Sequence, residues 1–204
     1  MAAKSKPRVL WIEDSARLEL RNLVGPLFFS SKYDFNLAED VTSAMRFLRD
    51  KEYDAVIVDI RLPPGIDPQW SQWYRQTGFD KVHAQLGLKL LRWLLAKDDT
   101  IHPDAPPAWI DAHRVAVFTV ESKQEIQNHL DELGIQIFQQ KSAGLRDTTL
   151  LELIDQILAQ GRATENCTNV FGETGATLYN RIKSRTVWAS LAVVAVLCSF
   201  GSSG

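Results

Sequence analysis

Cysteine is almost absent from the sequence, and the two cysteines present, Cys167 and Cys198, both lie near the C-terminus. They provide neither a disulfide framework nor the paired spacing of a zinc site, and the four histidines show no ligand spacing. We therefore expect a protein of the reducing cytoplasm. The first seven residues agree, because they are polar and lack the apolar core of a secretory signal peptide.

An excess of basic charge is also missing. The chain has 23 lysine and arginine residues against 25 acidic ones, which gives a formal net charge of −2. Proteins that bind nucleic acid usually carry a basic surplus, so no nucleic-acid partner is expected. Hydrophobic residues occupy 45% of the 204 positions, enough for the core of one domain with an appendage.

The sequence does contain a regular alternation of apolar strand patterns and amphipathic helix patterns. Strands are expected at residues 8–12, 33–38, 55–58, 113–119 and 135–138. Helices are expected at residues 15–29, 42–50, 87–96, 121–133 and 148–160. This alternation predicts an α/β fold in which helices flank a doubly wound, five-stranded parallel sheet.

Two helix ends carry specific expectations. Ser15 is placed to cap the first helix, and Leu18 and Leu23 are among the candidate core residues of that helix. Gly25 and Pro26 interrupt its pattern, which predicts a kink or an early end. Gly134 is expected at the end of the fourth helix, where a residue tolerant of positive φ is preferred.

Residues 65–86 interrupt the alternation with a connection that is long for a compact domain. This segment holds four aromatic residues among polar ones: Trp70, Trp73, Tyr74 and Phe79. Two interpretations are open. The segment is either a flap that buries its rings on the domain or a partner-binding surface close to the site.

Reactive polar residues follow the strand patterns at the point where the strands end. Glu13 and Asp14 follow the first strand, and Asp59 follows the third. Thr119 ends the fourth strand, and Lys141 comes after the fifth. Because the C-terminal ends of parallel strands meet at one edge of a sheet, these side chains are expected to lie together.

The chemistry of these residue types is consistent with phosphoryl transfer. Clustered carboxylates repel one another unless a cation joins them, and Mg²⁺ prefers oxygen ligands. An ammonium and a hydroxyl beside them suit an incoming phosphoryl group, because both stabilise its oxygens. The pattern therefore indicates a Mg²⁺ site in which Asp59 is the nucleophile.

This ordered set of residues resembles the receiver domain of bacterial two-component response regulators. The resemblance rests on the acidic pair, the sequence Val-Asp-Ile-Arg-Leu-Pro at residues 58–63, the threonine at 119 and the lysine at 141. It covers about residues 7–160. It implies the flavodoxin-like receiver fold, with residues 65–86 as an insertion.

The resemblance also implies roles for the acidic residues. Asp59 would accept a phosphoryl group from a histidine kinase or a phosphotransfer protein. Asp14, Asp59 and the main-chain carbonyl of Arg61 would hold Mg²⁺, while Glu13 would act mainly through water. The only chemistry implied is transfer to Asp59 and loss from it, so the chain is not expected to be an enzyme that acts on other substrates.

The remaining site residues are implied to act in switching. Lys141 would pair with the phosphoryl group, and Thr119 and Phe138 would move when it is present. That movement would change a surface read by a downstream protein. Two departures from the family pattern stand out: Ser142 replaces a proline, so a trans peptide is expected before it, and Val120 is larger than usual and would restrict access.

Two other functions compete with the phosphorylation switch. A receiver-like adaptor would bind partners without phosphorylation, through the insertion and the tail. The second competing function is an enzyme of the haloacid-dehalogenase type, which would form an aspartyl-phosphate intermediate. That family expects a second aspartate two residues after the nucleophile, where this chain has Arg61.

The C-terminal region has a different composition. Residues 161–177 are polar and contain glycine, which is typical of a linker. Residues 178–204 begin with basic side chains and continue with an apolar run from Val187 to Phe200. We expect this tail to contact a membrane and to tether an otherwise cytoplasmic protein. The alternative is a helix docked on a partner or an oligomer.

Overall fold

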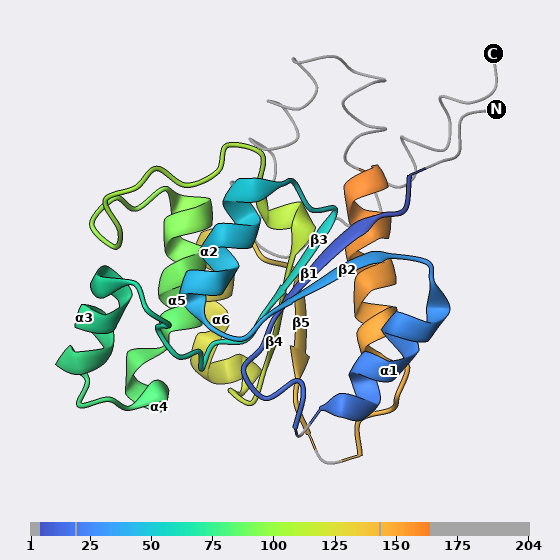
Figure 1. The fold of residues 1–204 in the computed structure, drawn as a ribbon, viewed down its shortest axis with the longest axis horizontal. Coiled ribbons are helices and arrows are strands. Elements are labelled where there is room, and N and C mark those ends of the chain that lie inside the picture. Colours follow the sequence, from blue (N-terminus) through green and yellow to red (C-terminus); the bar gives the residue numbers. More distant parts are fainter. Residues whose placement is uncertain (1–4, 19, 143, 164–204) are drawn as a thin grey trace. The chain divides into compact units, whose positions relative to one another are not determined.

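A parallel β-sheet forms the centre of the fold in the computed structural model, which describes residues 5–18, 20–142 and 144–163 (Figure 1). Its strands lie in the order β2-β1-β3-β4-β5, and all neighbours are parallel. They are β1 (Arg8–Ile12), β2 (Asp34–Ala38), β3 (Ala55–Val58), β4 (Val115–Thr119) and β5 (Ile137–Gln140). This confirms the predicted doubly wound, five-stranded sheet.

The inner strands β1, β3 and β4 are apolar at every buried position except Thr119, because both faces of the sheet are covered. Successive side chains of a strand point to opposite faces. In β1, Leu10 and Ile12 join one layer of the core, whereas Val9 and Trp11 join the other. The sheet therefore divides the hydrophobic core into two layers.

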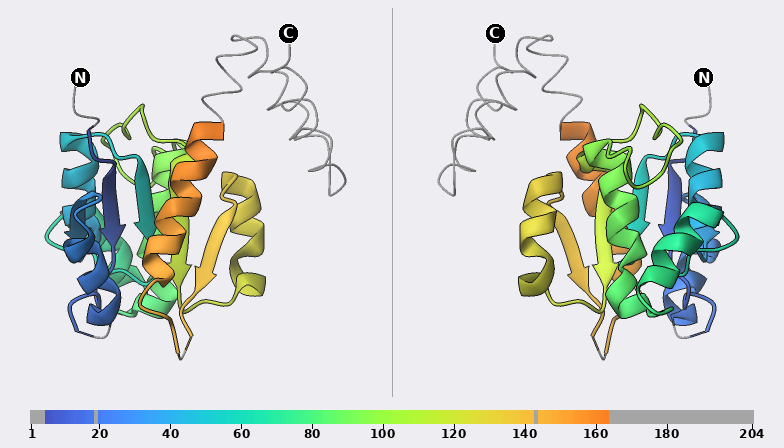
Figure 2. Two further views of the ribbon diagram at one scale, coloured as in Figure 1. Left: turned by 90° about the vertical axis from the view of Figure 1, so that its right-hand side faces the viewer. Right: turned by 90° about the vertical axis from the view of Figure 1, so that its left-hand side faces the viewer.

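Helices cover both faces of the sheet (Figures 1 and 2). One face is covered by α2 (Val41–Asp50), α5 (Leu86–Leu91) and α6 (Lys123–Leu133). The other is covered by α1 (Arg21–Ser30) and a helix over residues 149–163. Helix α5 continues into a π-helical turn, η1 (Arg92–Ala96), and a 3₁₀ turn, η2 (Ala112–Arg114), precedes β4.

The inserted residues 65–86 are not a plain loop, because they form α3 (Pro68–Gln76) and α4 (Lys81–Ala84). Trp70 is fully buried, and its indole Nε1 donates a hydrogen bond to Met45 Sδ of α2 at 2.7 Å. Trp73 and Tyr74 are partly buried against the same core layer, whereas the Phe79 side chain is 65% exposed. Three of the four rings thus fit the flap interpretation.

The first helix begins later than predicted. Ser15 does not cap it, because the Ser15 hydroxyl donates to Glu13 Oε1 at 2.7 Å and residues 14–18 form turns. Leu18 is 81% exposed and is not a core residue, although Leu23 is buried as expected. The helix also runs through Pro26 instead of ending there.

The last strand lies two residues later than predicted. Ile135 lies just after the C-cap of α6, where its N–H donates to the Leu130 carbonyl at 2.9 Å and its side chain is buried. Gly134 has the positive φ that was expected of it, at 72°. Strand β5 consequently ends at Gln140, and Lys141 follows it directly.

The C-terminal region, residues 161–204, is almost entirely outside the described residues. The last helix extends to residue 163, three residues into the predicted linker. The rest of that linker, and the apolar run from Val187 to Phe200, lie beyond the described part. Within the residues that are described, no helix is long and apolar enough to cross a membrane.

Candidate functional site

The ends of β1 and β3 place two carboxylates side by side. Ile12 and Val58 are paired in the sheet, and the Asp59 N–H donates to the Ile12 carbonyl at 3.0 Å. Glu13 and Asp59 are the next residues after these two strands. Both are buried, Glu13 completely and Asp59 with 3% of its surface exposed. The acidic site therefore lies between the C-terminal ends of β1 and β3, where the strand order of the sheet changes direction.

Lys141 enters the same site from the end of β5. The Lys141 N–H donates to the Thr119 carbonyl at 2.7 Å, which fixes the backbone of Lys141 beside β4. Its ammonium lies 3.0 Å from Asp59 Oδ2 and is also in ionic contact with Glu13 Oε2. The peptide before Ser142 is trans, as predicted. One ammonium thus bridges two buried carboxylates.

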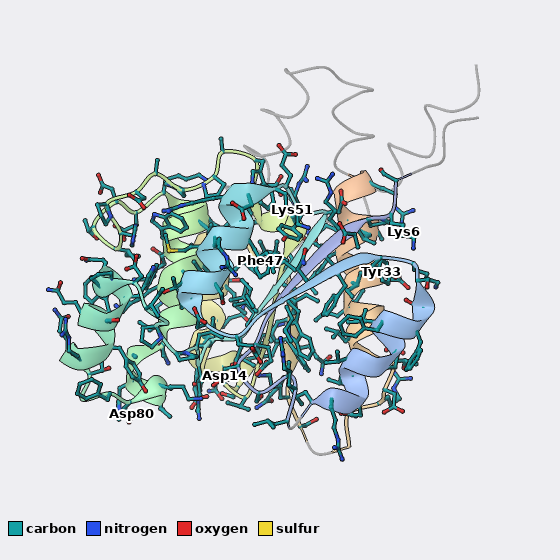
Figure 3. All side chains as sticks on the ribbon, viewed as in Figure 1. Lys6, Asp14, Tyr33, Phe47, Lys51 and Asp80 are labelled. Atoms are coloured by element: carbon teal, nitrogen blue, oxygen red, sulfur yellow. The ribbon has the colours of Figure 1, made fainter. Side chains whose placement is uncertain are left out.

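Asp14 completes the acidic cluster. Glu13, Asp14 and Asp59 each place one carboxylate oxygen in a group of three, and these oxygens lie within 4.8 Å of one another. Asp14 is half-buried at the C-terminal edge of the sheet, on the side of Asp80, the N-cap residue of α4 (Figure 3). Its Oδ2 is in ionic contact with the Lys81 ammonium of α4.

The electrostatics of Glu13 favour an additional cation. Burial raises the pKa of the Glu13 carboxyl, and the neighbouring Asp59 charge raises this pKa further, although Lys141 and Ser15 oppose the shift. Glu13 Oε2 accepts no hydrogen bond of regular geometry within the described structure, despite its ionic contact with Lys141. An all-oxygen donor set that includes a buried carboxylate oxygen without a hydrogen bond fits Mg²⁺.

The main chain of Thr119 contacts Lys141, but within the described residues no hydrogen bond joins the side chain of Thr119 or Phe138 to the acidic cluster. Thr119 is fully buried at the end of β4, and its hydroxyl accepts a hydrogen bond from the Glu121 N–H at 3.4 Å. Phe138 is half-buried in β5, opposite Val117. Their switching roles stay predictions.

Arg61 follows Asp59 by two residues, and its side chain has a partner of its own. Its Nε donates to Glu121 Oε1 at 2.7 Å, and this hydrogen bond raises the pKa of the Arg61 guanidinium. The predicted metal contact concerns only the main-chain carbonyl of Arg61 and stays a prediction. Val120 directly precedes Glu121 in the chain, and its side chain is 43% exposed.

Two residues that the sequence did not single out shape the site. The Gly87 N–H donates to the Ile60 carbonyl at 3.0 Å, and a Cβ at Gly87 would lie 1.8 Å from the Asp59 carbonyl oxygen. A glycine at the predicted start of a helix was the available signal. Nothing in the sequence indicated that Lys81 contacts Asp14, because the two residues are 67 positions apart.

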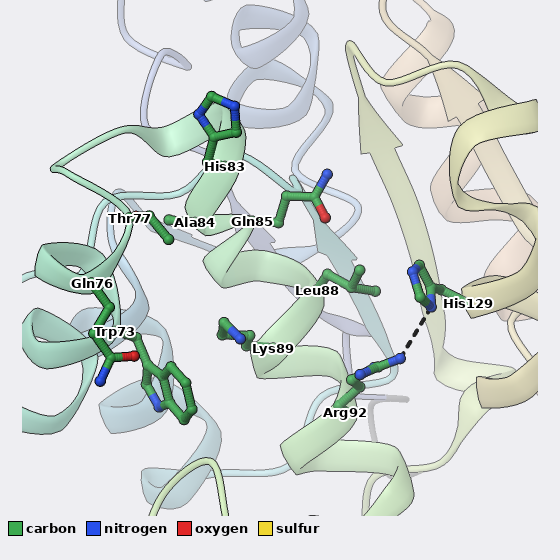
Figure 4. Close-up of a pocket in the computed structure, with 10 residues that line it drawn as sticks. All are labelled: Trp73, Gln76, Thr77, His83, Ala84, Gln85, Leu88, Lys89, Arg92 and His129. Carbon is green, nitrogen blue, oxygen red and sulfur yellow. Dashed lines mark hydrogen bonds between the residues drawn. The ribbon is translucent and has the colours of Figure 1, made fainter.

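A cavity of about 410 Å³ lies between the insertion and α5 (Figure 4). Its lining includes Trp73, His83, Lys89, Arg92 and His129. Arg92 Nη2 lies 3.1 Å from His129 Nδ1. Of the described residues that line it, none belongs to the acidic cluster, so the cavity is a separate feature.

Comparison with known proteins identifies the fold. No protein-family model matches the sequence, and no curated protein matches it. Among solved structures, the chain is similar to a CheY-like response regulator receiver domain protein from Methanospirillum hungatei JF-1. The identity is 17% and the TM-score 0.51, over 78% of this chain and 98% of that one. This chain has the receiver fold.

A longer protein with a similar region is NtrX from Brucella abortus. The match has 17% identity and a TM-score of 0.53, and it covers 96% of this chain but only 34% of the NtrX chain. In the present chain, residues 65–85 with α3 and α4 connect β3 to α5, and the interpretation of this connection as an insertion stays a prediction. The acidic cluster and Lys141 occupy the C-terminal edge of its sheet.

Proposed function

We propose that the chain is a phosphorylation-controlled signalling switch in which Asp59 accepts a phosphoryl group. The observation that carries this proposal is the position of the Lys141 ammonium, 3.0 Å from Asp59 Oδ2, in a buried site that also holds Glu13 and Asp14. A carboxylate at a strand end with a fixed cation and a set of oxygen ligands suits acyl-phosphate chemistry. The receiver fold supports the same proposal.

The transfer step uses the Asp59 carboxylate as nucleophile. One carboxylate oxygen forms a bond to the phosphorus of a phosphohistidine donor. The bond between phosphorus and the donor nitrogen breaks, and its electron pair remains on the imidazole, which takes up a proton. The product is a mixed anhydride on Asp59, and water later cleaves its bond to phosphorus, which restores the carboxylate and releases inorganic phosphate. The donor is therefore a histidine kinase or a phosphotransfer protein.

The other residues of the site neutralise charge. Asp14, Asp59 and the Arg61 carbonyl would hold Mg²⁺, with Glu13 acting through water, and this ion supplies positive charge to the phosphoryl oxygens. Lys141 needs little movement to reach the same oxygens from its position beside Asp59. The site acts only on its own aspartate, so the chain is a switch and not an enzyme for other substrates.

The output of the switch is a change of surface. Thr119 moves toward the phosphoryl group, because its hydroxyl is a hydrogen-bond donor at the end of the neighbouring strand. Phe138, half-buried in β5, then turns inward and alters the surface around β5 and α6. A downstream protein reads this surface.

Labelling with a small phosphodonor tests the proposal. The full chain is incubated with Mg²⁺ and acetyl phosphate, and its intact mass is measured. The wild-type chain should gain one phosphoryl group, and Asp59→Asn should gain none, because an amide is not a nucleophile of this kind. Asp99→Asn is the matched control, because Asp99 is exposed and remote in sequence from the site. It should be labelled like the wild type.

Two results would contradict the switch. Equal labelling of Asp59→Asn and the wild type would show that another residue accepts the group. No labelling by acetyl phosphate or by any of a panel of histidine kinases would favour the receiver-like adaptor. In that case the Asp59→Asn chain should also retain all its partner binding.

A further inference from the structure

A second cation reaches the acidic site from the insertion. The ammonium of Lys81, the first residue of α4, is in ionic contact with Asp14 Oδ2. Lys81 therefore adds a positive charge to the acidic cluster, although it lies in the connection between β3 and α5 and not at the end of a strand.

The charge balance of the cluster makes Lys81 and Mg²⁺ competitors. Three carboxylates converge there, and Lys141 supplies one compensating positive charge. A divalent cation supplies the other two, which leaves the cluster neutral without Lys81. With Lys81 also in place the site would carry excess positive charge, and like charges a few ångströms apart repel. Both cations also use the same carboxylate, Asp14.

The segment that carries Lys81 is only lightly held. In α4 only Ala84 is buried, while Phe79 just before it is 65% exposed and Val82 within it is 43% exposed. His83 and Ala84 also line the cavity of about 410 Å³ (Figure 4), and Ala84 is the α4 residue that joins the hydrophobic core. A segment with few buried apolar contacts opens at low free-energy cost.

We propose that Lys81 is a built-in competitor of Mg²⁺ at Asp14. The insertion thereby sets the Mg²⁺ concentration at which Asp59 can be phosphorylated. When Mg²⁺ binds, Lys81 leaves Asp14 and α4 detaches from the acidic edge of the sheet. This inference rests on the proposed function for its metal site, but it adds a residue outside the receiver pattern and a conformational consequence.

Calorimetric titration of the full chain with Mg²⁺ tests the competition directly. Lys81→Met removes the charge and keeps most of the side-chain length, so Mg²⁺ should bind about fivefold more tightly, the size of one partly exposed ion pair. Lys81→Arg keeps the charge and should bind like the wild type. Lys32→Met is the matched control, because Lys32 is exposed in the turn before β2, at the opposite end of the strands. It should leave Mg²⁺ affinity unchanged.

Hydrogen exchange of the insertion supplies a second readout. In the wild-type chain, saturating Mg²⁺ should speed amide exchange over residues 77–85, because the Lys81 contact is lost. In Lys81→Met the same amides should exchange fast already and should not respond to Mg²⁺. If Mg²⁺ weakens the contact between Lys81 and Asp14, that contact must weaken Mg²⁺ binding by the same free energy, because coupling is reciprocal.

The outcomes separate this inference from the proposed function. If Lys81→Met and the wild type bind Mg²⁺ equally, Lys81 is not a competitor, and the metal site stands. Weaker binding by Lys81→Met would also overturn the inference, because Lys81 would then be orienting Asp14 for the metal. If no variant binds Mg²⁺, both the inference and the metal role in the proposed function fail.

Discussion

Gly87 is the residue whose size matters most to the geometry of Asp59. The first turn of α5 lies against the backbone at Asp59 and Ile60, and a hydrogen bond from the Gly87 N–H to the Ile60 carbonyl holds it there at 3.0 Å. A methyl group at position 87 would overlap the Asp59 carbonyl oxygen at 1.8 Å. Backbone atoms cannot rotate away, so either α5 or the chain at Asp59 and Ile60 must shift.

We predict that Gly87→Ala lowers the free energy of unfolding by about 2 kcal/mol or more, which is typical of forced overpacking. It should also slow labelling of Asp59, since the carboxylate moves relative to Lys141. Urea denaturation and the acetyl phosphate assay measure the two effects. Gly161→Ala is the control, because nothing lies within 4 Å of a Cβ there. Wild-type stability in Gly87→Ala would contradict the proposed packing.

Residues at strand ends could be placed from the sequence, because parallel strands bring their C-terminal ends to one edge. Glu13, Asp59 and Lys141 were found together for that reason. Lys81 could not be placed, since its contact with Asp14 depends on the path of an irregular insertion. The predicted capping role of Ser15 was wrong, because the Ser15 hydroxyl donates its hydrogen bond to Glu13 and not to a helix end.

At the scale of elements, the insertion is fastened to the domain at α3. Asp67 caps α3, and its N–H donates to Thr42 Oγ1 of α2 at 3.0 Å. Trp70 is fully buried and stacks on His102, with ring centroids 5.9 Å apart. The Trp73 indole donates to the Ile101 carbonyl at 3.0 Å. Helix α3 is therefore an anchor, and α4 is the lightly held part of the insertion.

Trp70→Ala should destabilise the chain by about 3 to 5 kcal/mol, as truncation of a buried aromatic residue usually does. Phe79→Ala, in the same insertion, should change stability by less than about 0.5 kcal/mol because its ring is mostly exposed. Thermal or urea unfolding of the pair measures the contrast. Equal effects of the two substitutions would mean that the insertion is not anchored through Trp70.

Element boundaries were predictable where a local pattern decides them and not where tertiary contacts do. The apolar run of β3 and the glycine that ends α6 were placed correctly from the sequence. The start of α1 was not, because Ser15 is drawn to the acidic site. The start of β5 was not, because Ile135 completes the end of α6 and is already buried there.

At the scale of the whole molecule, the order of strands is what creates the site. The alternation of strand and helix patterns sufficed to predict the sheet, since each strand carries apolar side chains for both layers of the core. That order brings the ends of β1 and β3 together and β4 beside β3. Asp59 thus meets partners that lie far from it in the chain, which is the arrangement that the proposed switch requires.

Direct location of the phosphoryl group tests this account most sharply. The full chain is phosphorylated with acetyl phosphate and Mg²⁺ and treated with borohydride, which reduces an acyl phosphate of aspartate to homoserine. Peptide mass spectrometry then finds the converted residue. The account predicts homoserine at position 59, none at position 14, and none anywhere when Mg²⁺ is chelated. Homoserine at another aspartate, or its absence at position 59 in a chain that has gained a phosphoryl group, would contradict it.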